Sequence, residues 1–193
     1  AVDHLTGRKT DDKLAGTELA RLGAFLKRSW RANDWFWGRM DGASRLVEML
    51  LAPQHLHRTL RNSDANAAIT KFLEASVFSQ LTDTDRSTIS GELLAIVAEA
   101  DERRAPRPSK TIQLVAREIQ LAIAREELPH VADAIRRSRE IERANDLNGA
   151  RFLRLYDAQT SPPTTPEAVM ALVEAMEVGR ESVGTEVGYG LLN

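Results

Sequence analysis

The stretch SKTIQLVAREIQLAIAREEL, residues 109–128, decides the fold class of this chain. Its apolar side chains recur every three or four positions, which is the period of an α-helix and not of a strand. The residues of this apolar surface are Ile112, Val115, Ile119, Ala122 and Ile123, widened by Leu114, Leu121 and Leu128. A helix with so wide an apolar surface is expected to lie centrally in a bundle and to be contacted on several sides.

The ends of this helix and the segments around it also have helical signals. Ser109 is a good N-cap residue, and Pro129 is expected to end or kink the helix, with a second long helix following it. No segment of the chain alternates with period two over five or more residues. The sequence therefore predicts an all-α protein, a multi-helix bundle-like array of about seven or eight helices.

Upstream, residues 1–12 are polar and are expected to form a loosely ordered lead-in. A helix is predicted from Thr17, and Asn33 or Asp34 is expected to cap a second helix that Pro53 ends. The apolar residues expected on the inner face of that second helix are Trp37, Met40, Leu46, Val47, Leu50 and Leu51.

Gly38 and Gly42 lie inside the second predicted helix. Each costs about 1 kcal/mol relative to alanine in a helix interior. Their presence indicates either a close approach of another element or a break near Asp41.

Further breaks and caps divide the rest of the chain. Two prolines in residues 104–109 indicate a loop where two helical halves of one domain, residues 1–193, would meet. We expect Asp64 to cap a helix over 67–77 and Asp83 or Asp85 to open the next. Thr164 and Glu167 have the spacing of a capping box, and Pro166 falls in the first turn of the last helix. Residues 180–193 are rich in glycine and are expected to be loosely ordered.

Composition excludes several classes of function. The net charge of −2 gives no electrostatic reason to expect a nucleic-acid partner. The chain has neither an apolar run long enough to span a bilayer nor a secretory signal, and it has no cysteine, so we expect a cytoplasmic protein. His55 and His57 point in different directions on a helix and do not predict a metal site, and no cofactor-binding motif is found.

All three tryptophans lie in the stretch WRANDWFWGRMDGA, residues 30–43. On a helix Trp35 and Trp37 diverge by about 200°, so they cannot both face one core. Arg31 and Asp34 are three residues apart and can form an ion pair. We expect part of this stretch to be buried and part to form an interface. The candidate interface residues are Trp30, Arg31, Asp34, Trp35, Trp37, Gly38, Arg39 and Asp41.

Residues 22–43, LGAFLKRSWRANDWFWGRMDGA, resemble the W-R-x-N-D-W-x-W-G-R-x-D segment of large bacterial patatin-related proteins. In that family the segment lies in a domain of unknown function, downstream of a patatin-like acyl-hydrolase domain. Residues 178–188, VGRESVGTEVG, are similar to the V-G-x-E element near the end of that family's proteins. The middle of the chain is similar only in being helical and rich in arginine and alanine.

The resemblance implies an accessory region of a lipid acyl hydrolase whose partner is the catalytic domain of the same polypeptide. Patatin-like enzymes use a serine in G-x-S-x-G and an aspartate in D-G-G/A, and this chain lacks the serine motif. Asp41-Gly42-Ala43 matches the D-G-A form, but a general base without a nucleophile does no chemistry. We therefore expect Asp41 to be structural, bonded to the backbone or to Arg39. Contact with lipid would be peripheral and would come through the parent enzyme.

A second hypothesis remains open. The wide apolar surface around Leu114, Ile119 and Leu121 is also typical of a bundle that carries a small apolar ligand between its helices. In that case the chain would be a self-sufficient binding module for a ligand or a protein partner.

Overall fold

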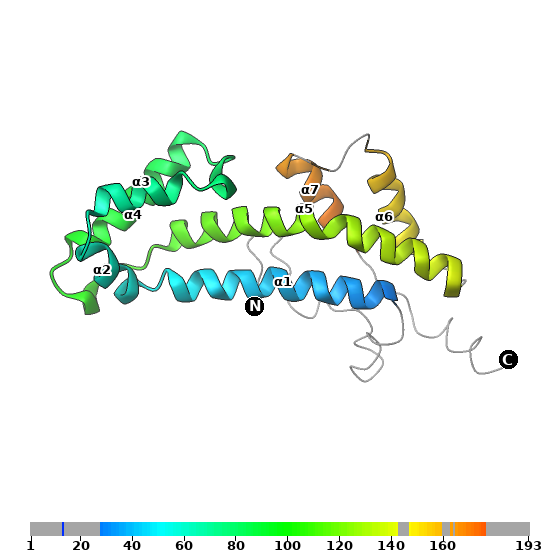
Figure 1. The fold of residues 1–193 in the computed structure, drawn as a ribbon, viewed down its shortest axis with the longest axis horizontal. Helices are drawn as coiled ribbons and strands as arrows, with labels where there is room; N and C mark the ends of the chain where they lie inside the picture. Colours follow the sequence, from blue (N-terminus) through cyan, green and yellow to red (C-terminus); the bar gives the residue numbers. More distant parts are fainter. Residues whose placement is uncertain (1–12, 14–27, 143–146, 160–162, 164, 177–193) are drawn as a thin grey trace. The chain divides into compact units, whose positions relative to one another are not determined.

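The computed structural model describes residues 13, 28–142, 147–159, 163 and 165–176. Within these residues every regular element is a helix, so the all-α class is confirmed (Figure 1). The α-helices are α1 (Arg28–Leu50), α2 (Pro53–Arg61), α3 (Ala65–Leu73), α4 (Asp83–Ala98), α5 (Ser109–Glu142), α6 (Leu147–Asp157) and α7 (Pro166–Ala175). Two short 3-10 helices, η3 (Ser76–Phe78) and η4 (Glu102–Arg104), follow α3 and α4. The lead-in, the helix predicted from Thr17 and the C-terminal tail lie outside the described residues.

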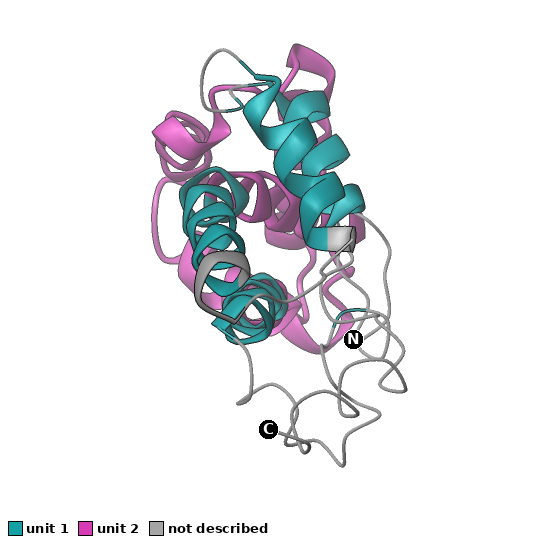
Figure 2. Ribbon diagram, turned by 90° about the vertical axis from the view of Figure 1, so that its right-hand side faces the viewer, with its two compact units in different colours: residues 1–41, 123–193 teal, residues 42–122 magenta. Residues whose placement is uncertain are grey.

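Internal contacts divide the chain into two compact units (Figure 2). Unit 1 comprises residues 1–41 and 123–193, and unit 2 comprises residues 42–122. The limits between the units fall inside α1 and inside α5. The loop in residues 104–109, where two halves were expected to meet, lies within unit 2 and leads from α4 to α5.

Helix α5 runs without interruption through Pro129 for 34 residues. The prediction that Pro129 ends the helix and that a separate helix follows is therefore wrong. A proline in a helix interior removes one hydrogen bond and costs about 3 kcal/mol. Leu128, Val131 and Ile135 are fully buried on both sides of the proline. Each contributes about 1.5–3 kcal/mol by burial, which is enough to keep the helix continuous.

Helix α1 begins at Arg28 and continues through Asn33 and Asp34, so the predicted cap at these residues is wrong. The Asn33 side chain is buried and donates from Nδ2 to the carbonyl oxygen of Lys13 over 2.8 Å. The helix is also unbroken at Gly38 and Gly42, and a Cβ added at either glycine would meet no atom within 4 Å. Neither a break nor a close approach explains these glycines.

Short polar residues start the smaller helices. The Asp64 side chain accepts a hydrogen bond from the Ala67 amide, which confirms that cap, although α3 starts at Ala65 and ends at Leu73. Helix α4 begins at Asp83, as predicted, and is capped by Thr82, which forms a capping box with Asp85.

The caps of the last helix and of the segment after α1 also differ from the predictions. Helix α7 is capped by Thr165, one residue after the predicted Thr164, with Pro166 in the first turn as expected. Pro53 begins α2 as its first residue, after α1 has ended at Leu50. Proline fits there because the first amide of a helix has no partner within the helix.

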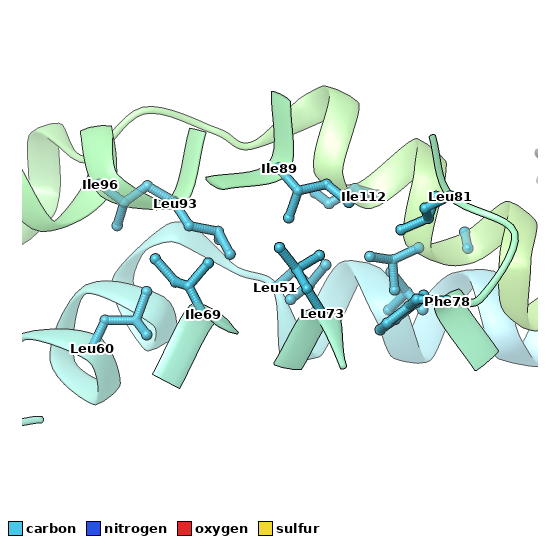
Figure 3. Close-up of a cluster of buried hydrophobic side chains, with 13 residues drawn as sticks. Leu51, Leu60, Ile69, Leu73, Phe78, Leu81, Ile89, Leu93, Ile96 and Ile112 are labelled. Atoms are coloured by element: carbon cyan, nitrogen blue, oxygen red, sulfur yellow. The ribbon is translucent and has the colours of Figure 1, made fainter. Parts of the chain in front are cut away.

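The core of unit 2 joins four short elements to the ends of the two long helices. Leu60 of α2 and Ile69 and Leu73 of α3 point toward Ile89, Leu93 and Ile96 of α4 (Figure 3). The other buried members are Val47, Leu51, Phe78, Leu81, Ile112, Val115 and Ala116. Val47 in α1 and Leu51 directly after the helix are buried, whereas Leu46 and Leu50 are 58% and 61% exposed, so their predicted inward position is wrong.

The core of unit 1 is built from apolar residues of four helices. Helix α1 contributes Trp30, Phe36, Trp37 and Met40, all buried. The buried residues of the other three helices are Leu128, Val131, Ala132 and Ile135 of α5, Phe152 of α6, and Val169, Leu172 and Val173 of α7. Helices α6 and α7 contact one another within this unit. The burial of α5 residues on both sides of Pro129 thus belongs to this core.

Adjacent leucines of α4 test the assignment of the unit 2 core. Leu93→Ala is expected to lower the free energy of unfolding by about 2–4 kcal/mol, because Leu93 is 3% exposed and truncation leaves a cavity. Leu94→Ala, at a side chain that is 39% exposed, should change it by less than about 1 kcal/mol. Urea unfolding followed by circular dichroism measures both, and equal effects would contradict the assigned register.

Candidate functional site

The three tryptophans of α1 divide between the interior and the surface. Trp30 and Trp37 are 5% and 1% exposed, whereas Trp35 is 66% exposed. Phe36, between Trp35 and Trp37, is fully buried, and its ring meets that of Trp37 edge to face at 5.1 Å between centroids. The predicted divergence of Trp35 and Trp37 is confirmed, and it follows from the rotation of about 100° per residue along a helix.

Lys13 is the polar centre of the buried side of this stretch. Its side chain is completely buried, and its ammonium lies 5.3 Å from the centroid of the Trp37 ring and forms an ion pair with the Asp41 carboxylate. Its backbone carbonyl accepts the hydrogen bond from Asn33. We call Lys13, Asn33, Trp37 and Asp41 the Lys13 clamp. The clamp attaches the chain at residue 13 to three successive turns of α1.

Asp41 therefore has a partner other than the one predicted. Its carboxylate pairs with Lys13 and not with Arg39, so the expected Asp41–Arg39 contact is wrong. Its part in an ion pair agrees with the expectation that Asp41 is structural. No pairing rule within one helix could have predicted this partner, because Lys13 is 28 residues away in the chain.

Arg39 pairs with two carboxylates of α5 instead. Its Nη1 and Nη2 donate to Oε1 and Oε2 of Glu126 over 3.0 and 3.1 Å, and Nη1 also donates to Glu127. The hydrogen bond from Arg39 lowers the pKa of Glu126, and the bonds to Glu126 and then Glu127 raise the pKa of Arg39. With the hydrogen bond from the Ser29 amide to the Ser138 hydroxyl, 3.1 Å, these contacts set α1 antiparallel to α5 in unit 1.

The remaining candidate residues form the exposed side of α1 in unit 1. Arg31, Trp35 and Gly38 are exposed, and the spacing i, i+4, i+7 places them on one face of the helix. We call these three residues the Trp35 stripe. Asp34 is half-buried, and Asn33 Nδ2 donates to its Oδ1 over 3.1 Å. The Arg31–Asp34 ion pair stays a prediction.

The other polar groups that the sequence singled out have local structural roles. His57 is buried, and its Nε2 lies 2.9 Å from the carbonyl oxygen of Glu99, whereas His55 is exposed. In α5, Arg136 pairs with Asp157 of α6, and Arg137 pairs with Asp133 one turn earlier. Within the described part of the chain, no group of three or more His, Asp or Glu side chains could hold a metal ion.

The apolar surface of α5 that suggested a ligand-binding bundle is packed in the interior of unit 2. Leu114 and Ile119 are partly buried and pack against the core of unit 2, and Leu121 is fully buried. Beside these residues, the buried Gln120 side chain donates to the hydroxyl of Ser44 over 2.8 Å, so α1 and α5 share a polar contact in unit 2 as well.

These features define a helical domain that presents one tryptophan on the surface of a helix and holds another against a buried lysine. Comparison with known protein families shows to which family the chain belongs. The family model described as a protein of unknown function (DUF3376) matches residues 3–179, and the chain belongs to this family.

A similar protein is known from Mycobacterium tuberculosis (strain ATCC 25618 / H37Rv), where it is described as an uncharacterized membrane protein. The two chains are 61% identical over 44 residues, which is 23% of this chain and 4% of the relative. The match thus spans a small part of a much longer protein. No solved structure matches this chain. Among the helices whose residues the structure describes, none is long and apolar enough to cross a membrane.

The Lys13 clamp can be tested through Asp41. Asp41→Asn leaves the buried Lys13 ammonium without its counter-charge and should lower the free energy of unfolding by about 2–4 kcal/mol. This is slightly less than the cost of breaking a fully buried ion pair, because the Asp41 side chain is 21% exposed. The matched control is Asp133→Asn, whose pair with Arg137 is about half exposed on both sides and is expected to contribute at most about 0.5 kcal/mol. Equal effects in chemical denaturation would show that the clamp is not a buried pair.

The Arg39–Glu126 contact predicts a pH dependence. The pKa of Glu126 is lowered from 4.5 in the folded state, so its contribution to stability is complete above the unfolded value and is lost as the pH falls through the folded value. The melting temperature of Glu126→Gln should therefore lie a few degrees below that of the wild type at pH 7. Well below pH 4.5, the two melting temperatures should coincide. Glu167→Gln, at an exposed position in α7, serves as the control. A difference between Glu126→Gln and wild type that persists in acid would contradict this assignment.

Proposed function

We propose that this chain is a non-catalytic helical accessory domain of a patatin-like lipid acyl hydrolase and that the Trp35 stripe docks on the catalytic domain of the same polypeptide. The observation that carries the proposal is the 66% exposure of Trp35 between two turns of a helix whose other tryptophans are buried. An exposed indole leaves the favourable free energy of burial unused, because an aromatic side chain can bury about 150–250 Å² of apolar surface.

The stripe has the composition of an interface centre. Tryptophan and arginine dominate the energetics of protein interfaces, and the stripe offers one of each beside a glycine. Among the residues that the structure describes, a Cβ at Gly38 would meet no atom within 4 Å, which leaves room for a partner's backbone to approach α1 there. The backbone that presents Trp35 is fixed from behind, because Phe36 and Trp37 are both buried. A backbone that is already fixed adds no ordering cost of its own when the side chain binds.

The choice of partner rests on the resemblance of residues 22–43 to the patatin-related proteins. The long relative supports an accessory role, because the matched segment is 4% of that protein. The sequence has no G-x-S-x-G motif, and Asp41, its D-G-A aspartate, is paired with Lys13. We accordingly assign the chemistry to the parent enzyme, place that enzyme in the cytoplasm because the chain lacks cysteine, and ascribe any lipid contact to it.

The experiment begins with the reading frame that precedes Ala1. We expect it to encode G-x-S-x-G and a second D-G-G/A motif. That upstream segment, expressed separately, should bind the present chain, and Trp35→Ser should weaken the binding at least about 30-fold, as expected for a hot spot of at least about 2 kcal/mol. Isothermal titration calorimetry measures both constants.

The matched control is Met49→Ser, a substitution of an apolar side chain on the same helix that is 71% exposed and lies outside the stripe. It should leave the binding constant unchanged. An upstream frame without the patatin-like motifs would refute the choice of partner, and equal losses for both variants would refute the stripe. Hydrolysis of nitrophenyl esters by the isolated chain, abolished by Asp41→Asn, would instead restore a catalytic role for that aspartate.

A further inference from the structure

The end of α1 that belongs to unit 2 has an exposed apolar surface. Leu46, Met49 and Leu50 are 58%, 71% and 61% exposed, whereas Val47 of the same turns is buried in the core of unit 2. The spacing i, i+3, i+4 places the three exposed side chains next to one another on one face of the helix. We call Leu46, Met49 and Leu50 the Met49 patch. A group of adjacent exposed apolar side chains, unlike a single one, indicates a contact surface.

The charges beside the patch favour an anionic partner. Among the residues one helical turn before its members, only Arg45 has a charged side chain, and it is exposed. Glu48 is two positions from both Leu46 and Leu50, so it points to a different side of the helix. Its carboxylate pairs with Arg107 over 3.4 Å. The patch therefore combines three aliphatic side chains with an adjacent cation.

The patch is too small for a stable interface between proteins. With exposures of 58–71%, its three side chains offer on the order of 200 Å² of apolar surface. A stable interface takes about 800 Å² from each partner, and its hot spots are mostly aromatic. A second copy of the chain would therefore bury too little area here.

A lipid surface has no such requirement. It adapts its shape to the protein, and the same apolar area is enough for weak, reversible binding with a partition constant on the order of 10³–10⁴ M⁻¹. An arginine beside the apolar side chains adds attraction to anionic headgroups. The size, the aliphatic character and the charge of the patch thus favour the same kind of partner.

We propose that the Met49 patch is a peripheral contact for an anionic lipid surface. The three aliphatic side chains insert at the boundary between headgroups and acyl chains, and the guanidinium of Arg45 stays among the lipid phosphates. The patch lies in unit 2 and the Trp35 stripe in unit 1, so the two contacts use different residues. In the parent enzyme, lipid contact would be made through this domain. Binding of lipid by the chain itself does not depend on the catalytic domain.

The test uses the full chain and unilamellar vesicles of phosphatidylcholine, with or without about 30% phosphatidylglycerol, at low ionic strength. Co-sedimentation should show binding to the anionic vesicles that salt weakens, and several-fold weaker binding to the neutral ones. Met49→Ser should lower the partition constant about tenfold, because it removes the most exposed member of the patch. Arg45→Gln should lower it about fivefold, on anionic vesicles alone.

Two matched controls separate this surface from others. Leu94→Ser replaces an apolar side chain of α4 that is 39% exposed and lies outside the patch, and it should bind vesicles as the wild type does. Trp35→Ser should also bind them unchanged, although it is expected to lose the catalytic domain. Met49→Ser has the opposite expected pattern, so failure of either proposal can be distinguished from failure of the other.

A fluorescent label gives a second measurement. The chain has no cysteine, so Met49→Cys provides a single site for an environment-sensitive fluorophore. Its emission should shift to shorter wavelength when anionic vesicles are added, because the label enters an apolar environment. The same fluorophore on Leu94→Cys should not shift.

Four outcomes would overturn the proposal. One is a wild type that binds neither kind of vesicle, and another is equal binding by Met49→Ser and the wild type. Equal binding to neutral and anionic vesicles would refute the anionic surface. A dimer in analytical ultracentrifugation that Met49→Ser abolishes would assign the patch to a second copy of the chain instead.

Discussion

The ammonium of Lys13 has no contact with water, so unit 1 has to supply its counter-charge and its environment from within. The Asp41 carboxylate and the face of the Trp37 ring do so, and Asn33 holds the backbone at the same residue. A buried ion pair of this kind adds little net stability compared with an apolar pair, but it strongly penalises any arrangement that separates its members. The clamp therefore fixes which side of α1 faces inward, and the positions of the remaining residues of this stretch depend on that orientation.

Once Trp37 and Asp41 face inward, helix geometry determines the rest. Trp35 is two residues from Trp37 and so points away from the clamp, as its exposure shows. Arg39, also two residues from Trp37, emerges at the edge of the buried side, where Glu126 and Glu127 of α5 accept its hydrogen bonds. One buried cation thus accounts for a surface tryptophan and for the ion pairs beside it.

The periodic pattern of apolar residues was sufficient to predict the fold class and the divergence of the tryptophans, because both depend on spacing within one helix. Predictions that depended on distant residues were wrong. Pro129 and Asn33 have the local character of helix breakers or caps, yet α5 and α1 continue through them because core burial and the bond to Lys13 outweigh local preference. The partners of Asp41 and Arg39 are 28 and 87 residues away in the chain, and no pairing rule for a single helix reaches so far. The predicted inner face was too wide: it included Leu46 and Leu50 beside Val47 and Leu51, and only the latter two are buried.

The many arginines of the chain can be explained on the same physical basis. Arg39 joins α1 to α5, Arg58 joins α2 to η4, and Arg136 joins α5 to α6, where its guanidinium also lies 5.9 Å from the centroid of the Tyr156 ring. Arg86 donates to the backbone carbonyls of Leu73 and Phe78, where α3 and η3 end. A planar fork with several donors can satisfy two carboxylates or two carbonyls at once, which a lysine ammonium does less well. Arginine therefore adds polar links between elements of this fold. Trp35, which the helix exposes, has no part in these links, and it is the side chain for which we propose a partner in the catalytic domain.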